Sequence, residues 1–209
     1  MTETRYAADD SAVLLVDFLN DFLAKDGKLA PEIGAMVARL DLKRKYRRLI
    51  DGARAAGIKL FYVPHGVDEH SFDDVPRLHP RIQHGVDQRI TWIGGWGDDF
   101  YPPLKPKAGD LVVIHHRQYN GFIRTDLDAM LKARGIARVV LAGHTSHTCV
   151  EGTGRHALEA GYHVTYLKDA VAEFSEMAHQ FAVEVSYPTF GHEVLTVDEF
   201  LDRTDASKR

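Results

Sequence analysis

Short apolar runs alternate along most of this chain with longer segments whose apolar residues recur at helical spacing. The runs predict buried strands over residues 11–16, 58–63, 110–115, 136–142, 162–167 and 190–197. The spacing between them predicts helices over the stretch from Pro31 to Gly57, after Thr125, from about Cys149, after Ser175, and over 198–201. Because strands and helices alternate, we expect an α/β protein with three layers, α/β/α, around a mainly parallel sheet of roughly six strands, as one domain over residues 1–209.

Residues 64–109 show little periodicity. A connection of this length is uncommon in a compact domain unless it lines a site or forms a lid. It contains both tryptophans, Trp92 and Trp96, which could wall a substrate pocket. They could equally belong to a satellite core or a subunit contact. We predict a long loop or lid over about 64–109.

The composition is that of an ordinary globular protein, with 209 residues, 44% of them hydrophobic and 27% charged. A net charge of −4 gives no electrostatic reason to expect a nucleic-acid or membrane partner. No apolar run approaches the ~20 residues of a membrane span, and the polar first residues, MTETRYAADDSAV, lack the pattern of a signal peptide. The single cysteine excludes an intrachain disulfide. We therefore expect a cytoplasmic protein.

Three chemically capable side chains follow predicted strands. Asp17 follows the first strand, His116 the third, and Cys149 the turn after the fourth. A lone cysteine is usually a small buried hydrophobic residue. At the carboxyl end of a strand and the start of a helix, however, backbone N–H groups favour thiolate, and ligands of parallel sheets bind at this edge. Position therefore favours Cys149 as a nucleophile, while Asp17 could cap a turn or act as a functional carboxylate.

Four stretches together resemble one family. They are VDFLNDF at 16–22, GGWGDDFYPPLKPKAGD at 94–110, YNGF at 119–122 and GHTSHTCVEGTGRHALEAGY at 143–162. In this order they resemble the isochorismatase-like cysteine hydrolases, which include nicotinamidases, carbamoylsarcosine amidohydrolases, ureidoacrylate hydrolases and biuret hydrolases. The resemblance covers nearly the whole chain and implies a fold of Rossmann-like topology. It also implies hydrolysis of a C–N bond in a small amide, ureide or carbamoyl compound.

The resemblance also implies roles for individual residues. Cys149 would attack the carbonyl carbon, and Asp17 would act first as base and then as acid. Backbone N–H groups of Cys149 and Thr145 would form the oxyanion hole, with a cis peptide at His144–Thr145.

One position departs from the family pattern, because His116 stands where the family has a lysine. His116 could donate to Asp17 and stabilise thiolate as an imidazolium, or it could be the base itself. Arg117 could supply the fixed positive charge instead, although its side chain should point to the other face of the strand. A degenerate site that acts only in binding is a further alternative.

The remaining expectations concern ligands and partners. The candidate substrate-binding residues are Phe22, His65, Trp92, Trp96, Tyr119, Asn120, His144 and His147. Nicotinamidases of this family bind zinc, and Asp68 and His70 have a suitable spacing, but scattered loop histidines are more often plain polar residues, so we expect no metal or other cofactor. A small-molecule substrate and a homodimer or homotetramer follow from the resemblance. A vinyl ether hydrolase of the isochorismatase type is the alternative enzyme, and Cys149 counts against it.

Overall fold

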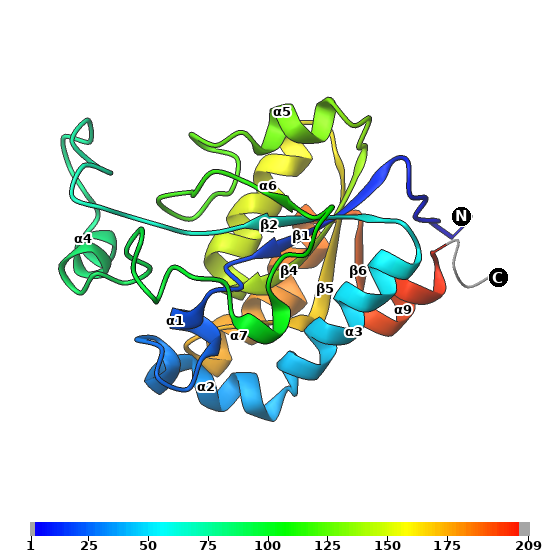
Figure 1. Cartoon of the computed structure of the whole chain (residues 1–209). Helices are drawn as coiled ribbons and strands as arrows, with labels where there is room; N and C mark the ends of the chain where they lie inside the picture. The colour runs from blue at the N-terminus through cyan, green and yellow to red at the C-terminus, as the bar shows by residue number, and fades with distance from the viewer. Residues whose placement is uncertain (1–2, 205–209) are drawn as a thin grey trace.

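The computed structural model describes residues 3–204 (Figure 1). Within them, the strands form one six-stranded sheet in the order β3-β2-β1-β4-β5-β6, and all neighbours pair in parallel. The strands are β1 (Ser11–Val16), β2 (Lys59–Val63), β3 (Leu111–Val112), β4 (Arg138–His144), β5 (His163–Ala172) and β6 (Glu193–Leu195). The predicted α/β class with a parallel sheet is confirmed.

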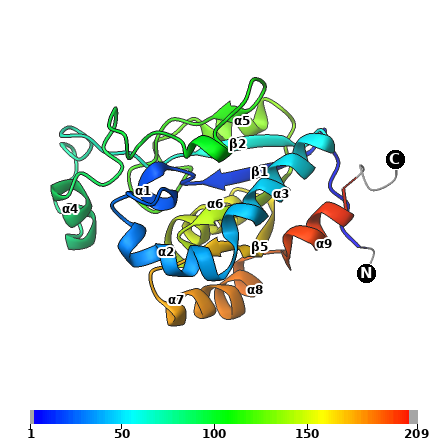
Figure 2. The ribbon, with the colours of Figure 1, turned by 60° about the horizontal axis from the view of Figure 1, so that its bottom comes forward.

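Helices cover both faces of the sheet, because side chains along a strand alternate between its two faces. Val13 and Leu15 of β1 join the core under α2 (Ala30–Arg39), α3 (Leu42–Ala55) and α9 (Val197–Asp202) (Figure 2). Leu14 and Val16 join the opposite core. The helices of that second layer are α5 (Leu127–Lys132), α6 (Glu151–Glu159) and α8 (Tyr187–Phe190).

Several element boundaries differ from the sequence prediction. The third strand is limited to two residues at the sheet edge, where Ile114 is exposed. The fifth strand runs on to Ala172, and Phe190 belongs to α8 rather than to the last strand. The helix predicted from Pro31 is two helices, because Asp41 adopts a left-handed backbone (φ 52°) between them.

Of the two predicted helix caps, one is confirmed and the other is only partly right. Ser175 caps α7 (Glu176–Phe181) by accepting from the Ala178 N–H at 3.2 Å, as expected. The predicted cap at Thr125 is only partly right. Its hydroxyl accepts from the Leu127 N–H at 3.3 Å, but the residue that directly precedes α5 is Asp126.

The segment 64–109 is an ordered excursion that contains α4 (Pro80–Asp87) and a 3₁₀ turn at Pro102–Leu104. In Figure 1, α4 lies beyond the carboxyl ends of the strands. The buried carboxylate of Asp21, in α1 (Asn20–Leu23), accepts the Thr91 N–H at 2.7 Å and so ties this segment to the exit of β1. No helix in residues 3–204 is long and apolar enough to cross a membrane.

A close backbone approach joins the two central strands at their carboxyl ends. Gly143 of β4 pairs with Val16 of β1 and has a φ of 131°. A Cβ at Gly143 would overlap the carbonyl oxygen of Val16. Only glycine fits this contact, which brings Asp17, directly after β1, beside the chain that leaves β4.

Candidate active site

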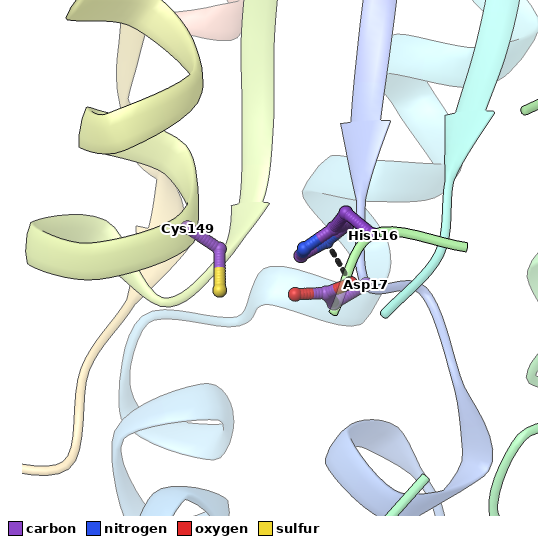
Figure 3. A group of neighbouring side chains, drawn as sticks. All are labelled: Asp17, His116 and Cys149. Atoms are coloured by element: carbon purple, nitrogen blue, oxygen red, sulfur yellow. Dashed lines mark hydrogen bonds and ion pairs between the residues drawn. The ribbon is translucent and has the colours of Figure 1, made fainter. Parts of the chain in front are cut away.

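Asp17 directly follows β1, His116 lies on the loop after β3, Cys149 lies in the helical turn after β4, and the three side chains meet (Figure 3). The Asp17 N–H donates to the Val63 carbonyl, and the His116 N–H donates to the Pro64 carbonyl, so both residues continue the pairing beside β2. One ligating atom from each of the three side chains lies within 4.8 Å of the others. The structure therefore brings together the three residues that the sequence singled out. Their catalytic roles stay predictions.

Asp17 is fully buried, and its two carboxylate oxygens differ in their hydrogen bonds. Its Oδ1 accepts the His65 N–H at 2.6 Å and lies 3.1 Å from Nε2 of His116. Its Oδ2 has no hydrogen-bond partner, and in Figure 3 an oxygen of Asp17 points toward the Cys149 sulfur. Burial alone would raise the pKa of Asp17, but the charge and hydrogen bond of His116, together with His65, hold it below its usual value.

His116 contacts an acceptor at each ring nitrogen. Its Nδ1 lies 2.9 Å from the Gln118 carbonyl oxygen, which can only accept, so Nδ1 carries a proton. Its Nε2 faces the carboxylate of Asp17. A hydrogen bond between Nε2 and the carboxylate needs a second proton. His116 and Asp17 together therefore hold two of these protons, one more than a neutral imidazole beside an ionised carboxylate. The additional proton lies between Nε2 of His116 and Oδ1 of Asp17.

Cys149 lies in a π-helical turn, Ser146–Val150, between β4 and α6. Its side chain is nearly inaccessible, with the Gln118 carbonyl at 3.8 Å from the sulfur. Burial raises the pKa of the thiol well above its usual value, and Asp17 raises it further. Burial and the Asp17 carboxylate thus oppose the thiolate that the helix start was expected to favour.

The turn before Cys149 has the predicted backbone feature, a cis peptide at His144–Thr145. The Thr148 hydroxyl lies 3.9 Å from the sulfur of Cys149, and Thr148 and Thr145 both oppose the rise of its pKa. The carboxylate of Glu173 anchors the same turn by accepting the His147 N–H at 3.0 Å. The oxyanion roles of Thr145 and Cys149 stay predictions.

A cavity of ≈ 150 Å³ opens at the thiol. Phe22, His65, Tyr119, Thr145, Thr148 and Cys149 line it, together with residues of α4 such as Arg81 and Ile82. Three of the eight predicted substrate-binding residues, Phe22, His65 and Tyr119, are therefore at the cavity wall. Its apolar lining suits a small molecule whose few polar groups meet specific partners.

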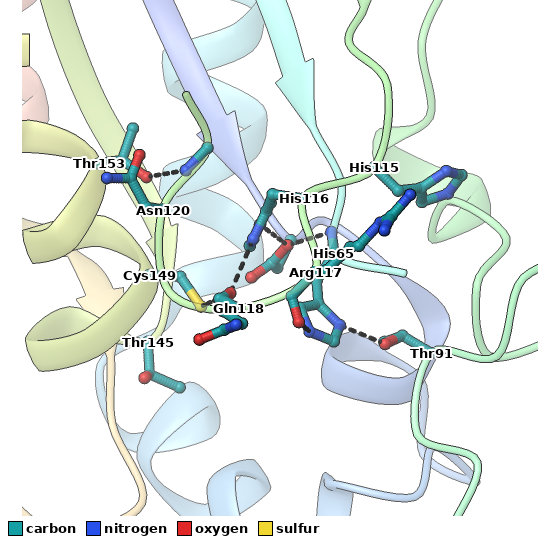
Figure 4. Close-up of polar contacts among 12 residues, drawn as sticks. His65, Thr91, His115, His116, Arg117, Gln118, Asn120, Thr145, Cys149 and Thr153 are labelled. Carbon is teal, nitrogen blue, oxygen red and sulfur yellow. Dashed lines mark hydrogen bonds and ion pairs between the residues drawn. The ribbon is translucent and has the colours of Figure 1, made fainter. Parts of the chain in front are cut away.

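His65 is a neutral member of this wall. Its Nε2 donates to the Arg117 carbonyl at 3.2 Å, and its Nδ1 lies 2.6 Å from the Thr91 hydroxyl (Figure 4). Burial, and then the charge of His116, lowers the pKa of His65 to about 4. The side chain of Arg117 points away from the site to the Ser71 carbonyl, so the structure does not place its charge beside the thiol.

The other predicted pocket residues lie outside this cavity. Trp92 packs under Arg89, and Trp96 is 53% exposed. Asn120 forms a hydrogen bond with His156 and lines a second cavity.

Two of the predicted histidines also lie off the cavity wall. His144 is fully buried behind Phe22, on which it stacks, and its Nε2 lies 3.2 Å from the Tyr46 hydroxyl. His147 is half-exposed, 3.7 Å from Glu173.

Asp68 and His70, the candidate metal ligands, interact with other side chains. Asp68 accepts from the Ser71 hydroxyl, and His70 is exposed and pairs with Asp73. Among the described residues, the one cluster with three possible metal-ligating atoms is the Asp17, His116 and Cys149 group itself. There, Nε2 of His116 already donates to Asp17, and its Nδ1 is held by a carbonyl.

Sequence reasoning missed Gln118 and Glu173. The Gln118 carbonyl accepts from both His116 and Cys149, and a backbone group leaves no trace in a side-chain pattern. Glu173 could have been predicted from the sequence, because it is an acidic residue directly after a buried strand, as Asp17 is. The strand was expected to end at Leu167, five residues before its actual end, so Glu173 was not recognised as a residue at a strand end.

Comparison with known proteins agrees with this geometry. A family model described as the isochorismatase domain matches residues 11–199. The chain belongs to the isochorismatase family. Among its family relatives is the ureidoacrylate amidohydrolase RutB of Variovorax paradoxus, which is 31% identical over 93% of this chain and 81% of its own length.

Solved structures of the isochorismatase family share the fold. A cysteine hydrolase from Pseudomonas syringae superposes with a TM-score of 0.81 at 25% identity, over 97% of this chain and 98% of its own. The N-carbamoylsarcosine amidase of Thermoplasma acidophilum gives a TM-score of 0.67 at 28% identity, over 90% of this chain and 97% of its own.

Proposed function

We propose that this protein is a cysteine-dependent amidohydrolase that cleaves a C–N bond of a small amide or ureide through a thioester on Cys149. The observation that carries the proposal is the unpartnered Oδ2 of Asp17, which is buried beside the thiol while His116 occupies Oδ1. An unsatisfied buried carboxylate oxygen is costly, and it is suited to accept a proton. The named activities of the ureidoacrylate and carbamoylsarcosine relatives support the substrate class.

The first half of the reaction forms the thioester. As the sulfur of Cys149 attacks the carbonyl carbon, its proton passes to Oδ2 of Asp17. Because the pKa of the thiol is raised and that of Asp17 is lowered, this transfer is uphill before attack and proceeds together with formation of the C–S bond. The oxyanion lies near the N–H of Thr145.

The second half regenerates the enzyme. Asp17 returns the proton to the leaving nitrogen, the C–N bond breaks, and ammonia or an amine departs. A water then attacks the thioester, gives one proton to Asp17, and Cys149 leaves as the thiol after receiving that proton. His116 keeps its proton throughout, and its positive charge holds Asp17 in the ionised form at the start of each cycle.

The test is ammonia release from a panel of small amides and ureides. Wild type should release ammonia, whereas Cys149→Ala and Asp17→Asn should not, at matched folding by circular dichroism. Mass spectrometry of quenched wild-type reactions should find an acyl group on Cys149. Turnover that persists in Cys149→Ala would contradict the proposal.

A further inference from the structure

Thr91, in the 64–109 segment, is a fully buried threonine with a strained backbone, at a φ of 48°. A positive φ is rare for a β-branched residue, and such strain persists only where the surrounding structure holds it. Two contacts hold Thr91. Its N–H donates to the carboxylate of Asp21 at 2.7 Å, and its carbonyl accepts the Val67 N–H at 3.3 Å. The fold therefore fixes the place of the Thr91 hydroxyl.

The Thr91 hydroxyl faces the ring of His65, with Oγ1 2.6 Å from Nδ1 (Figure 4). On the other side of the ring, Nε2 lies 3.2 Å from the Arg117 carbonyl oxygen, which can only accept, so Nε2 carries a proton. Nδ1 of a neutral His65 then has a lone pair, and the hydroxyl of Thr91 is the donor that faces it.

The hydroxyl of Thr91 has a second possible acceptor, because it also lies 2.7 Å from the Ile90 carbonyl. A hydroxyl has one proton to donate. If that proton went to Ile90, the lone pairs of Oγ1 and Nδ1 would face each other at 2.6 Å, unless His65 were doubly protonated. Burial opposes a cation there and lowers the pKa of His65 to about 4. The hydroxyl proton therefore belongs to the contact with His65.

His65 in turn holds the loop that follows β3. Its Nε2–H donates to the carbonyl of Arg117, the residue between His116 and Gln118. The Gln118 carbonyl lies 2.9 Å from Nδ1 of His116 and 3.8 Å from the sulfur of Cys149. The other tautomer of His65 would turn a lone pair toward the Arg117 carbonyl and repel it. The tautomer of one ring therefore bears on the backbone that contacts two residues of the site.

We propose that Thr91 is a positioning residue of the active site. Its hydroxyl keeps the proton of His65 on Nε2, and the His65 ring then holds the Arg117 carbonyl and the neighbouring Gln118 carbonyl in place. The 64–109 segment thus orders the loop after β3 through one hydroxyl. The effect on the reaction rate rests on the proposed function, whereas the tautomer of His65 and the place of the Gln118 carbonyl do not.

Two variants test the hydroxyl by its effect on ammonia release. Thr91→Val removes the hydroxyl and keeps the β-branched shape, and Thr91→Ser is the matched control that keeps the hydroxyl. Thr91→Val should lower kcat by about 10- to 100-fold, because small misplacements of reacting groups have effects of this size, and should change KM by less than about threefold. Thr91→Ser should keep kcat within about threefold of wild type. Unchanged kcat in Thr91→Val, or equal losses in the two variants, would overturn the inference.

Nitrogen-15 NMR of the histidine side chains tests the positioning without turnover. At neutral pH, His65 of wild type and of Thr91→Ser should show a protonated Nε2 and an unprotonated Nδ1 that accepts a hydrogen bond. In Thr91→Val the Nδ1 signal should move, because the ring loses its donor. The Nδ1–H signal of His116, which reports the Gln118 carbonyl, should shift in the same variant and stay in place in Thr91→Ser.

The NMR result also separates this inference from the proposed function. A protonated Nδ1 of His65 in wild type, or signals of His65 and His116 that are the same in wild type and Thr91→Val, would overturn the positioning role, whatever the outcome for the hydrolase. The expected signals in a protein that hydrolyses no amide or ureide would support the positioning role and count against the proposed function alone.

Discussion

Nε2 of His116 lies 3.1 Å from Oδ1 of Asp17, and both side chains are fully buried. The second nitrogen of the imidazole is held by the Gln118 carbonyl, so the ring donates on both sides. Because both of its ring nitrogens are engaged, His116 is not free to take the thiol proton. The contact favours one of the two roles that the sequence left open for this residue, and it leaves Asp17 as the proposed base.

Loss of the imidazolium should destabilise the fold. His116→Gln leaves the buried Asp17 carboxylate without a charged partner, and removal of one partner of a buried pair costs about 3–5 kcal/mol. Urea unfolding measures the change. The control is His115→Gln. The contact of His115 with Asp98 is partly exposed, so this substitution should lower the free energy of unfolding by less than about 1 kcal/mol. Equal effects of the two substitutions would contradict a charged His116.

His116→Lys tests the charge separately from the ring. A lysine retains a positive charge beside Asp17, so we expect ammonia release by this variant to exceed that of His116→Gln at pH 7, by about tenfold or more. Equal rates of the two variants would show that charge at this position is unimportant.

Alkylation of Cys149 should report a protonated thiol. Because burial and Asp17 raise its pKa, the rate with iodoacetamide should rise about tenfold per pH unit from pH 6 to 9, without a plateau. Asp17→Asn removes one cause of the raised pKa and should react faster at each pH, while its hydrolysis falls by about 100- to 10,000-fold. A plateau below pH 8 in wild type would mean a resting thiolate.

Two buried histidines should make the fold sensitive to mild acid. Burial lowers the pKa of His65 and of His144 from 6.5 to about 4. Between these pH values the unfolded chain binds the protons, so this part of the stability is complete above pH 6.5 and is lost as pH falls toward 4. Each histidine should contribute a loss of roughly 2 kcal/mol between pH 7.5 and 5.

Urea unfolding at the two pH values measures this loss. His144→Gln should reduce it by roughly 2 kcal/mol, because a glutamine side chain does not titrate. His70→Gln should leave it unchanged, since that side chain is exposed. An unaltered pH dependence in the His144 variant would refute the assignment.

Because β1 and β4 approach closely at Gly143, we expect alanine substitutions at Gly143 and at Gly34 to change the stability in opposite directions. Gly143→Ala should destabilise the protein by several kcal/mol or prevent folding, because its Cβ would overlap the Val16 carbonyl and its φ is positive. Gly34→Ala, inside α2 with open space at the Cβ position, should stabilise it by about 0.5–1 kcal/mol. Thermal unfolding compares the two, and a stable, active Gly143→Ala would refute the close contact.

The sequence by itself determined the α/β class and the convergence of Asp17, His116 and Cys149. Both follow from local patterns, because apolar runs identify buried strands and the carboxyl ends of parallel strands share one edge of the sheet. The cis peptide at His144–Thr145 followed from the family resemblance and is confirmed. In each case a short stretch of chain carried the information.

Only the tertiary structure decided the surroundings of the thiol and the wall of its cavity. Residues distant in sequence bury the thiol beside Asp17, which raises its pKa, and the Gln118 carbonyl faces the second nitrogen of His116. Trp96 is exposed, while Arg81 of the 64–109 segment reaches the cavity, and no periodicity in that segment predicted either position. Burial and charge depend on which segments meet in space, whereas a sequence pattern reports only what neighbours along the chain prefer.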